Sequence, residues 1–533
     1  MMKSLENWDL IQSAAFPYLD SFLTALPNPV LLQKELLQTI LFANQETVFG
    51  RNYQFASIGS YEEFCDRVPL QTYEDLSPYI QRIVVGEQGV LTAEPTIVFE
   101  MTGGSTQGPK LIPYTATGLD AFRQAILPSL ADLLQHRPKI KLGRTYWAIS
   151  PVTRPPTQTP GGIPIGLPND AAYFGKDLAA CVAELLAVSP AAVSNLELQE
   201  WRYLTALLLL AAEDLSLISV WSPTFLLQSI EAMQQERDRI LRAIAEGWGN
   251  MPANPTRARL LETAFSHPIP DTEKIWPQLD TISCWTDATA KAFMPQLQTL
   301  FPRVFMQGKG LLATEGAVTL PLMDCTAPVL AIRSGVYEFI DAEDRACLCN
   351  RLVEDRVYRL VMTTHSGLYR YDTGDRVRVR GWKAQTPLLE FVGRAGLVSD
   401  LCGEKISEDF VLNQFERCDK RSGFAMLAPS LQGSPHYVLF LDAGEENEAA
   451  AIAFCQQLER ALACNPQYQY ARQLGQLGTL RVQRVQNPLA RYIDRALQRG
   501  QRLGDIKPPS LRLETDWETF FKAEGKRQKA EDR

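Results

Sequence analysis

The chain has 533 residues, of which 46% are hydrophobic and 21% charged, and it carries a net charge of −8. This length exceeds what one hydrophobic core usually serves, so we expect at least two domains. The negative charge argues against a nucleic-acid backbone as the main partner. The N-terminus lacks the pattern of a signal peptide, and the ten cysteines and four histidines show no metal-ligand spacing. We therefore expect a cytoplasmic protein with reduced cysteines and no membrane anchor.

The first third of the chain predicts mostly helix. Apolar residues recur at helical spacing up to about residue 95, and another helix is predicted over Thr115–Leu134. Short β-branched and aromatic runs predict strands at Ile97–Phe99 and Thr145–Ile149. The segment Pro151–Asp170 is rich in proline and glycine, so we expect an irregular loop there.

The middle of the chain, Leu178–Gly247, again predicts helix. Its most apolar stretch, Leu204–Trp221, is interrupted by two acidic residues, which indicates a buried helix or helix pair and not a membrane span. Gln228–Glu246 has an amphipathic pattern and is followed by Gly247, a typical helix stop.

The last 200 or so residues predict short strands separated by turns, and then a small α/β region. A strand at His436–Asp442 and a helix at Glu445–Cys464 belong to that final region. The other predicted strands are Tyr337–Ile340, Val357–Thr363, Val377–Arg380 and Leu388–Val392.

The strongest candidate for chemistry is the segment Thr102–Lys110. Glycines let a backbone approach an anion and turn its N–H groups inward, and here hydroxyl groups and a terminal lysine accompany them. These are the groups that hold a polyphosphate, although the spacing is not that of a Walker loop. A surface hairpin is the alternative interpretation.

Two further segments carry acids in structured contexts. The run Gly308–Gly316 predicts a buried strand that delivers Thr314 and Glu315 to its end, where a glutamate can hold Mg²⁺. The run Gly367–Asp375 ends in Asp375 after a glycine, suited to accept two ribose hydroxyls. Taken alone, the first of these runs also fits a solvated glutamate in an ordinary turn, and the second also fits a plain β-turn.

Two charged segments follow toward the C-terminus. The fourth segment consists of Gly393-Arg394 and Gly403–Glu408 and lies at the expected domain junction. The fifth, Gly504–Pro509, presents Lys507 in a constrained loop.

The order of these five segments resembles the adenylate-forming (acyl-AMP synthetase) superfamily. Within it, the chain is similar to the auxin-responsive acyl acid amido synthetases of the Gretchen Hagen type, specifically their bacterial branch. The similarity covers about residues 60 to 510. It includes Ile275–Leu279, Gln307–Gly316, Tyr337–Ile340, Thr363–Asp375, Gly403–Phe410, Tyr470–Arg472 and Gly504–Pro508.

The resemblance implies an α/β fold with a large N-terminal ATP- and acyl-substrate-binding domain of mixed sheets and helices, residues 1–396. A smaller, mobile α/β C-terminal lid domain, residues 397–533, would follow, with a hinge at Gly393–Gly403. The implied catalytic residues are Lys110, Glu315 and Lys507, with Glu315 also the magnesium ligand. The implied nucleotide-binding residues are Thr102, Gly103, Gly104, Ser105, Thr106, Thr314, Asp375 and Arg394.

The resemblance also implies the reaction. With ATP and Mg²⁺, a small carboxylic acid becomes acyl-AMP, and the acyl group passes to an amine, with an amino acid expected, to form an amide. Trp285 and Tyr173 are candidate walls of the acyl pocket, and a monomer is the working expectation. The alternatives are transfer to a thiol of coenzyme A or a carrier protein, and an inactive nucleotide-binding scaffold.

Overall fold

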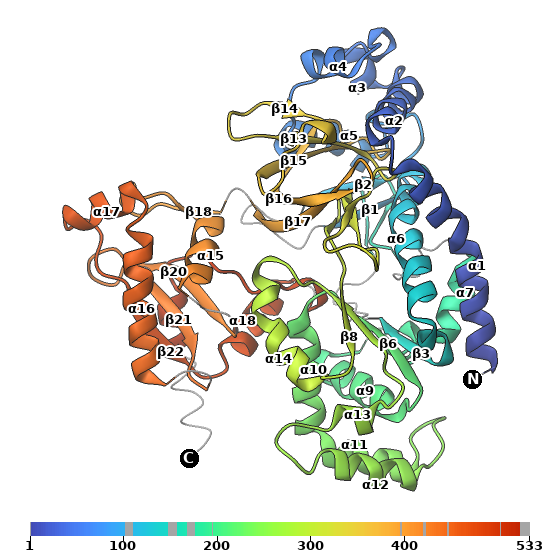
Figure 1. Cartoon of the computed structure of the whole chain (residues 1–533), viewed down its shortest axis with the longest axis vertical. Coiled ribbons are helices and arrows are strands. Elements are labelled where there is room, and N and C mark those ends of the chain that lie inside the picture. Colours follow the sequence, from blue (N-terminus) through green and yellow to red (C-terminus); the bar gives the residue numbers. More distant parts are fainter. Residues whose placement is uncertain are drawn as a thin grey trace. The chain divides into compact units, whose positions relative to one another are not determined.

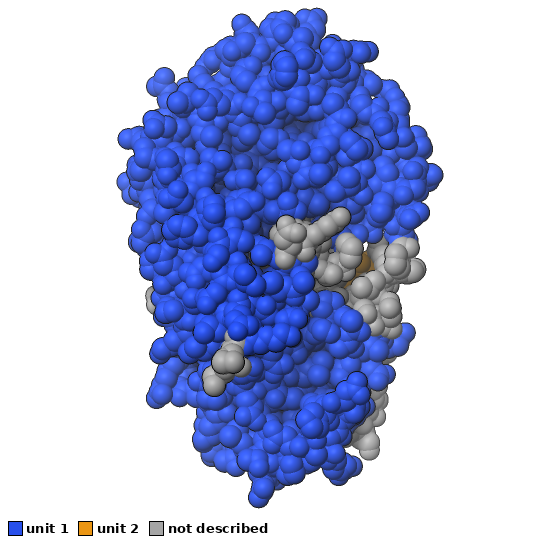
Figure 2. All heavy atoms as spheres, turned by 90° about the vertical axis from the view of Figure 1, so that its right-hand side faces the viewer, with its two compact units in different colours: residues 1–221, 225–285, 300–391 blue, residues 222–224, 286–299, 392–533 orange. Residues whose placement is uncertain are grey.

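The computed structural model describes residues 2–101, 110–147, 157–167, 176–193, 196–394, 397–418, 423–444, 447–501 and 503–522 (Figure 1). These residues form two compact units, coloured blue and orange in Figure 2. The first comprises residues 1–221, 225–285 and 300–391; the second comprises 222–224, 286–299 and 392–533. The second unit thus takes in two short segments from far earlier in the chain.

The first unit begins with helices, as predicted. The side chains of Ser60 and Thr72 accept hydrogen bonds from backbone N–H groups of α4 and α5 and cap their N-termini. Helix α1 packs along α6, the two running side by side in Figure 1. The helices are α1 (Met2–Ala25), α2 (Pro29–Asn44), α3 (Val48–Asn52), α4 (Tyr61–Arg67), α5 (Tyr73–Val84) and α6 (Ala116–His136).

The first unit contains a four-stranded parallel sheet. Its order is β3 (Arg144–Trp147), β6 (Leu215–Ser219), β7 (Thr281–Cys284) and β8 (Phe305–Gly308), and all neighbours run parallel. Parallel neighbours place all their carboxyl ends at one edge of the sheet. The connecting helices are α7 (Lys176–Leu185), α8 (Pro190–Val193), α9 (Leu198–Ala211), α10 (Pro223–Gln235), α11 (Arg237–Glu246), α12 (Pro255–Ala264), α13 (Thr272–Ile275) and α14 (Met294–Leu300).

The prediction of a helix or helix pair over Leu204–Trp221 was wrong in its second half. Helix α9 ends at Ala211, and the acidic pair leads into strand β6. A short apolar run fits a buried helix and a buried strand equally well, and pairing with β3 and β7 decides between them. The single helix predicted over Gln228–Glu246 is also two helices, α10 and α11, which divide at Glu236.

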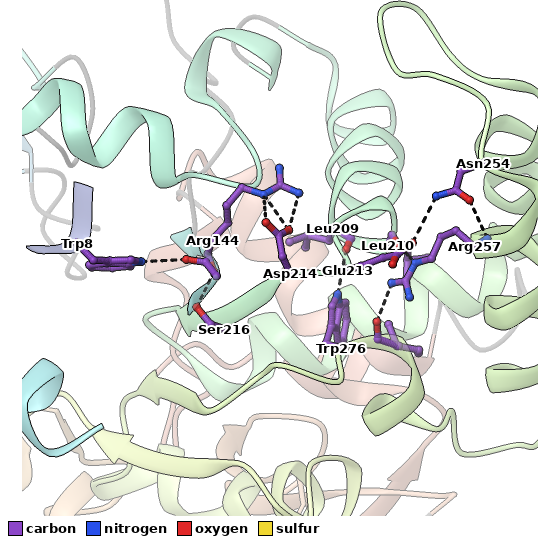
Figure 3. A network of polar contacts seen from close by, with 12 residues as sticks. Trp8, Arg144, Leu209, Leu210, Glu213, Asp214, Ser216, Asn254, Arg257 and Trp276 are labelled. Carbon is purple, nitrogen blue, oxygen red and sulfur yellow. Dashed lines mark hydrogen bonds and ion pairs between the residues drawn. The ribbon is translucent and has the colours of Figure 1, made fainter. Parts of the chain in front are cut away.

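Polar contacts hold the amino ends of this sheet in place (Figure 3). Arg144 forms a two-pronged ion pair with Asp214, with N–O distances of 2.7 to 3.0 Å. The Trp8 indole donates to the Gly143 carbonyl at 2.9 Å. Nearby, the buried Arg257 donates to the carbonyls of Leu210 and Ile275. These carbonyls lie at helix ends, where they lack partners within their own helices. The guanidinium therefore supplies hydrogen-bond donors to two helices at once.

The first unit also contains a seven-stranded, mostly antiparallel sheet. Its strand order is β11-β12-β17-β16-β15-β13-β14. The predicted strands are confirmed here, although three are longer than expected. The bounds are β11 (Thr319–Leu320), β12 (Val329–Leu330), β13 (Val336–Ile340), β14 (Ala346–Cys347), β15 (Val357–Thr363), β16 (Tyr371–Lys383) and β17 (Thr386–Arg394).

A smaller sheet joins β1 (Val98–Met101), β2 (Leu111–Tyr114), β4 (Thr157–Gln158) and β5 (Pro164–Ile165). The expected irregular loop at Pro151–Asp170 therefore contains a short hairpin, because β4 and β5 pair antiparallel. The Pro- and Gly-rich composition hid it; Pro164 is the first residue of β5, a position where a strand tolerates proline.

The second unit builds its own core around the sheet β20-β21-β22. Strand β21 has the predicted bounds, and β22 runs parallel to it. Within the described residues, no helix has the length and apolar character that crossing a membrane requires. The bounds are β18 (Val398–Ser399), β19 (Ile406–Ser407), α15 (Glu408–Arg417), β20 (Ala425–Ser430), β21 (His436–Asp442), α16 (Glu448–Leu462), α17 (Pro466–Gln473), β22 (Arg481–Val485) and α18 (Pro488–Gln498).

Candidate active site

Thr314 and Glu315 form the two-residue turn of a tight hairpin between β9 (Leu312–Ala313) and β10 (Gly316–Ala317). The prediction that a strand delivers Thr314 and Glu315 to its end is therefore confirmed, but that strand, β9, has only two residues and is half-buried, and a separate strand, β8, precedes it. The Glu315 side chain is nevertheless buried, with the residue only 6% exposed. A carboxylate at a turn is usually solvated, so its burial indicates a positioned group.

Two tyrosines hold this turn. The Tyr114 hydroxyl donates to the Thr314 carbonyl at 2.5 Å, and the Tyr371 hydroxyl donates to Glu315 Oε1 at 3.5 Å. Gly316 lies so close to Met362 that an added Cβ would come within 2.7 Å of the methionine methyl. The turn is thus pressed against strand β15 and tied to both β2 and β16.

Asp375 lies on a bulge of strand β16. The register moves from Arg359↔Arg376 to Val361↔Asp372, so Leu360 faces three residues of β16. The Thr373 hydroxyl donates to the Leu360 carbonyl at 3.2 Å and accepts from the Asp375 backbone N–H at 3.0 Å. The Asp-Thr-Gly-Asp sequence is therefore a bulge in a long strand and not a plain turn. Bulges are a common way to re-aim a side chain near an active site.

Glycine is needed within this bulge. Gly374 has a φ of 73°, in the left-handed region that glycine adopts without strain. Its N–H donates to Asp372 at 2.9 Å, and Asp375 is buried at 7% exposure. The bulge therefore holds a buried carboxylate on the strand that begins with Tyr371, which contacts Glu315.

The glycine-rich segment leads from β1 to β2, whose ends pair at Met101↔Leu111. The nucleotide-binding residues expected there, Thr102, Gly103, Gly104, Ser105 and Thr106, lie outside the described residues, as does Tyr173. Lys110 is described, and its ammonium lies 5.1 Å from the centre of the Tyr73 ring. The Tyr73 hydroxyl accepts from the Leu111 N–H at 2.9 Å, which fixes the start of β2.

Arg394 and Lys507 belong to the second unit, unlike the other described candidates. Arg394 is exposed at the end of β17, and Lys507 is exposed between the buried Ile506 and Pro508. Ser510 anchors the segment after Lys507, because its N–H donates to Glu408 at 3.1 Å and its carbonyl accepts from Leu427.

A buried ion pair braces the approach to β16. Arg370 and Glu338, exposed by 6% and 1% of their side chains, lie 2.9 Å apart. Arg370 also donates to the carbonyls of Cys65 and Val68, and Glu338 accepts from Tyr61 at 3.1 Å. Burial, with Glu338 adding to it, raises the pKa of the Cys65 thiol to about 12, so this cysteine stays protonated.

The metal-binding side chains of the described residues can be compared with the ligands that Mg²⁺ requires. The described residues contain no group of three His, Cys, Asp or Glu that could hold a metal. Mg²⁺ bound with a nucleotide typically takes one or two carboxylates and completes its shell with phosphate oxygens and water. The buried carboxylate of Glu315 fits that mode of binding.

Several residues that hold the candidate site in place were not identified from the sequence, namely Tyr114, Thr373 and the Glu338–Arg370 pair. Their roles depend on partners far along the chain, such as the Thr314 carbonyl 200 positions after Tyr114. Only the Thr-Gly within the Asp375 motif gave a local signal, because a hydroxyl beside a glycine is typical of an irregular strand.

Several known proteins are similar to this chain in sequence and fold. The chain is 24% identical over 531 residues to the probable indole-3-acetic acid-amido synthetase GH3.1 of Arabidopsis thaliana, covering 90% of this chain and 89% of the relative. It is 23% identical to the jasmonoyl–L-amino acid synthetase JAR6 of Nicotiana attenuata, covering 90% of each. The fold matches the solved structure of the AtGH3.15 acyl acid amido synthetase in complex with 2,4-DB, with a TM-score of 0.85, 21% identity and 96% coverage of both chains.

The chain therefore has the fold of that solved acyl acid amido synthetase, and the predicted α/β class, with a large N-terminal part and a smaller C-terminal one, is confirmed. Models of the GH3 family match three parts of the chain: the N-terminal domain at residues 18–306, the central domain at 328–394 and the C-terminal domain at 415–515. The chain belongs to the GH3 family, which confirms the family resemblance seen in the sequence.

Proposed function

We propose that this protein is an ATP-dependent acyl acid amido synthetase. In the first step, an oxygen of the substrate carboxylate attacks the α-phosphorus of ATP, and the bond to pyrophosphate breaks. In the second step, the nitrogen of an amino acid attacks the acyl carbon, the bond to AMP breaks, and the nitrogen loses its proton. The products are an amide, AMP and pyrophosphate.

The observation that carries the proposal is the buried Glu315, on a turn tied to β2 by Tyr114 and to β16 by Tyr371. Glu315 would hold Mg²⁺, which would neutralise charge on the phosphates during adenylation, and the backbone of Thr314 would bind near the α-phosphate. Prior positioning of such groups is the main way that a protein accelerates phosphoryl chemistry.

Asp375 binds the ribose in this proposal. A carboxylate accepts two hydroxyl donors at once, and the bulge fixes its direction through Thr373. Lys110 and the hydroxyl-bearing segment before it hold the phosphates. Lys507, exposed on the second unit, would neutralise charge on the phosphates during adenylation, and Arg394 belongs to the predicted hinge segment.

The named relatives support an amine as the acceptor, since one is a probable amido synthetase and the other a jasmonoyl–L-amino acid synthetase. Transfer to a thiol remains the alternative that the assay must separate. The chain would then consume the same acid and ATP but release AMP only with coenzyme A or a carrier thiol.

The test is acid-dependent release of AMP and pyrophosphate across a panel of carboxylic acids, with hydroxylamine as the trap. We expect hydroxamate with at least one acid, and a loss of at least about 100-fold in Glu315→Gln and Asp375→Asn, as for removal of a transition-state contact. The matched control is Glu262→Gln, an exposed glutamate. Release of AMP with amino acids supports the proposal, whereas release with thiols alone supports the alternative.

A further inference from the structure

Lys309 spans the carboxyl edge of the parallel sheet. It follows β8, and its backbone N–H donates to the Cys284 carbonyl at the end of β7 at 3.0 Å. Its ammonium donates to the Ser219 hydroxyl, at the end of β6, at 2.6 Å. Because β7 lies between β8 and β6, the side chain crosses the end of one strand to reach the next.

Two tryptophans accompany this lysine. Trp221 and Trp285 follow the ends of β6 and β7, and the Trp285 N–H donates to the Trp221 carbonyl at 2.8 Å. Their ring centres are 5.6 Å apart with a tilt of 39°. The Lys309 ammonium lies 5.2 Å from the centre of the Trp221 ring, a cation–π distance. Lys309 and both tryptophans are half-buried.

The location points to a ligand. In open α/β sheets, ligands bind at the carboxyl ends of parallel strands. Lys309 and Glu315 are six positions apart in the sequence, so their Cα atoms are at most about 22 Å apart even for an extended chain. The relatives named above act on different acids, so family membership by itself does not choose the acid.

We propose that Lys309, Trp221 and Trp285 form the subsite for the acyl group. They select a flat, aromatic or conjugated acid that carries a hydrogen-bond acceptor at the end remote from the reacting carboxylate. Indole faces pack well on flat rings, and an ammonium with three N–H donors can hold more than one acceptor at once. This inference rests on the proposed function, because it names the acid that the adenylation site would receive.

The experiment compares acids in matched pairs that differ only in the remote acceptor, such as benzoate and 4-hydroxybenzoate or 4-acetylbenzoate. In the unmodified protein we expect faster AMP release with the acceptor-bearing acid. In Lys309→Met we expect kcat/KM for that acid to fall by about 10- to 100-fold, as for loss of a charged hydrogen bond. The acid without the acceptor should change by less than about threefold, because its contacts remain.

Two further variants separate recognition from folding. Ser219→Ala removes the partner of the ammonium but keeps its charge, and we expect a smaller loss in the same direction. Lys274→Met is the matched control, because this lysine is exposed and pairs only locally with Asp271 in the described structure. It should leave both acids unchanged.

An equal loss for both acids of a pair in Lys309→Met would overturn the inference, because the lysine would then merely tie β8 to β6. The same conclusion follows if the variant leaves both acids unaffected. If no acid yields AMP with the unmodified protein, the proposed function fails. The subsite is then judged by calorimetric binding of the matched acids, where loss of the preference in Lys309→Met supports it and an unchanged preference refutes it.

Discussion

The phenol of Tyr114 donates a hydrogen bond to the backbone carbonyl of Thr314, and the two oxygen atoms are 2.5 Å apart. Tyr114 ends the strand that follows the glycine-rich segment, whereas Thr314 precedes Glu315 in the hairpin turn. This one bond therefore joins the strand that follows one of the five segments to another of those segments. It makes the position of the candidate magnesium ligand dependent on the strand beside the candidate phosphate loop.

Replacing Tyr114 with phenylalanine tests this dependence. Removing the hydroxyl leaves the Thr314 carbonyl without its donor, so we expect Tyr114→Phe to lose about 1 kcal/mol of stability and to release AMP roughly 3- to 10-fold more slowly. Urea unfolding and the hydroxamate assay measure the two effects. Tyr146→Phe is the matched control, because the buried Tyr146 hydroxyl has no hydrogen-bond partner among the described residues. Equal effects of the two substitutions would contradict a specific role for Tyr114.

The bulge around Asp375 depends on the hydroxyl of Thr373. Thr373→Val keeps the shape of the side chain but removes its hydrogen bonds with the Leu360 carbonyl and the Asp375 N–H. We expect KM for ATP to rise about tenfold with a smaller change in kcat, because a misplaced ribose ligand weakens binding before it affects chemistry. Thr373→Ser should restore most of the affinity. Steady-state kinetics with varied ATP check this, and an unchanged KM would show that the bulge does not need the hydroxyl.

Breaking the buried Arg370–Glu338 pair should destabilise the protein strongly. Removing one partner of a buried pair leaves the other charge uncompensated, so we expect Arg370→Met to cost about 3 to 5 kcal/mol. The double variant Arg370→Met/Glu338→Gln should recover part of that loss, since the orphaned charge is gone. The free energy of unfolding in urea gives both values. Lys274→Met, which removes an exposed pair, should cost less than about 1 kcal/mol, and strictly additive losses in the double variant would argue against coupling.

His365 should make the stability pH-dependent. Burial lowers the pKa of its imidazole below the ordinary value, although Asp120 and Glu94 act in the opposite direction. The unfolded chain then binds a proton at higher pH than the folded protein, so stability is full above the ordinary histidine pKa, about 6.5, and falls as the pH drops toward the folded pKa.

Unfolding in urea at several pH values between 5.5 and 7.5 measures this slope. We expect His365→Asn to flatten it over that range, because the only group removed is the one that gains a proton on unfolding. His267→Asn, at an exposed position, is the control and should keep the slope of the unmodified protein. A slope that persists in His365→Asn would assign the pH dependence to other groups.

Local patterns predicted much of the secondary structure. Strands β15 and β21 have the predicted bounds, because β-branched and aromatic residues lie between clear turn signals. Helix α6 begins where Thr115 accepts from the Gly118 N–H, a capping arrangement encoded within four residues. Strand β6 was missed, because an apolar run of that length is decided by its neighbours in the sheet and not by its own sequence.

The sequence by itself determined the family, because the order of five short segments depends only on the residues in the chain. It also singled out Glu315 and Asp375 as candidate site acids, without deciding their surroundings. Tertiary structure decided what those surroundings are: a hairpin turn buried beneath two tyrosines, and a bulge whose shape depends on Leu360 of the next strand. Burial and register arise from residues tens to hundreds of positions away, so no local pattern of residue types can specify them.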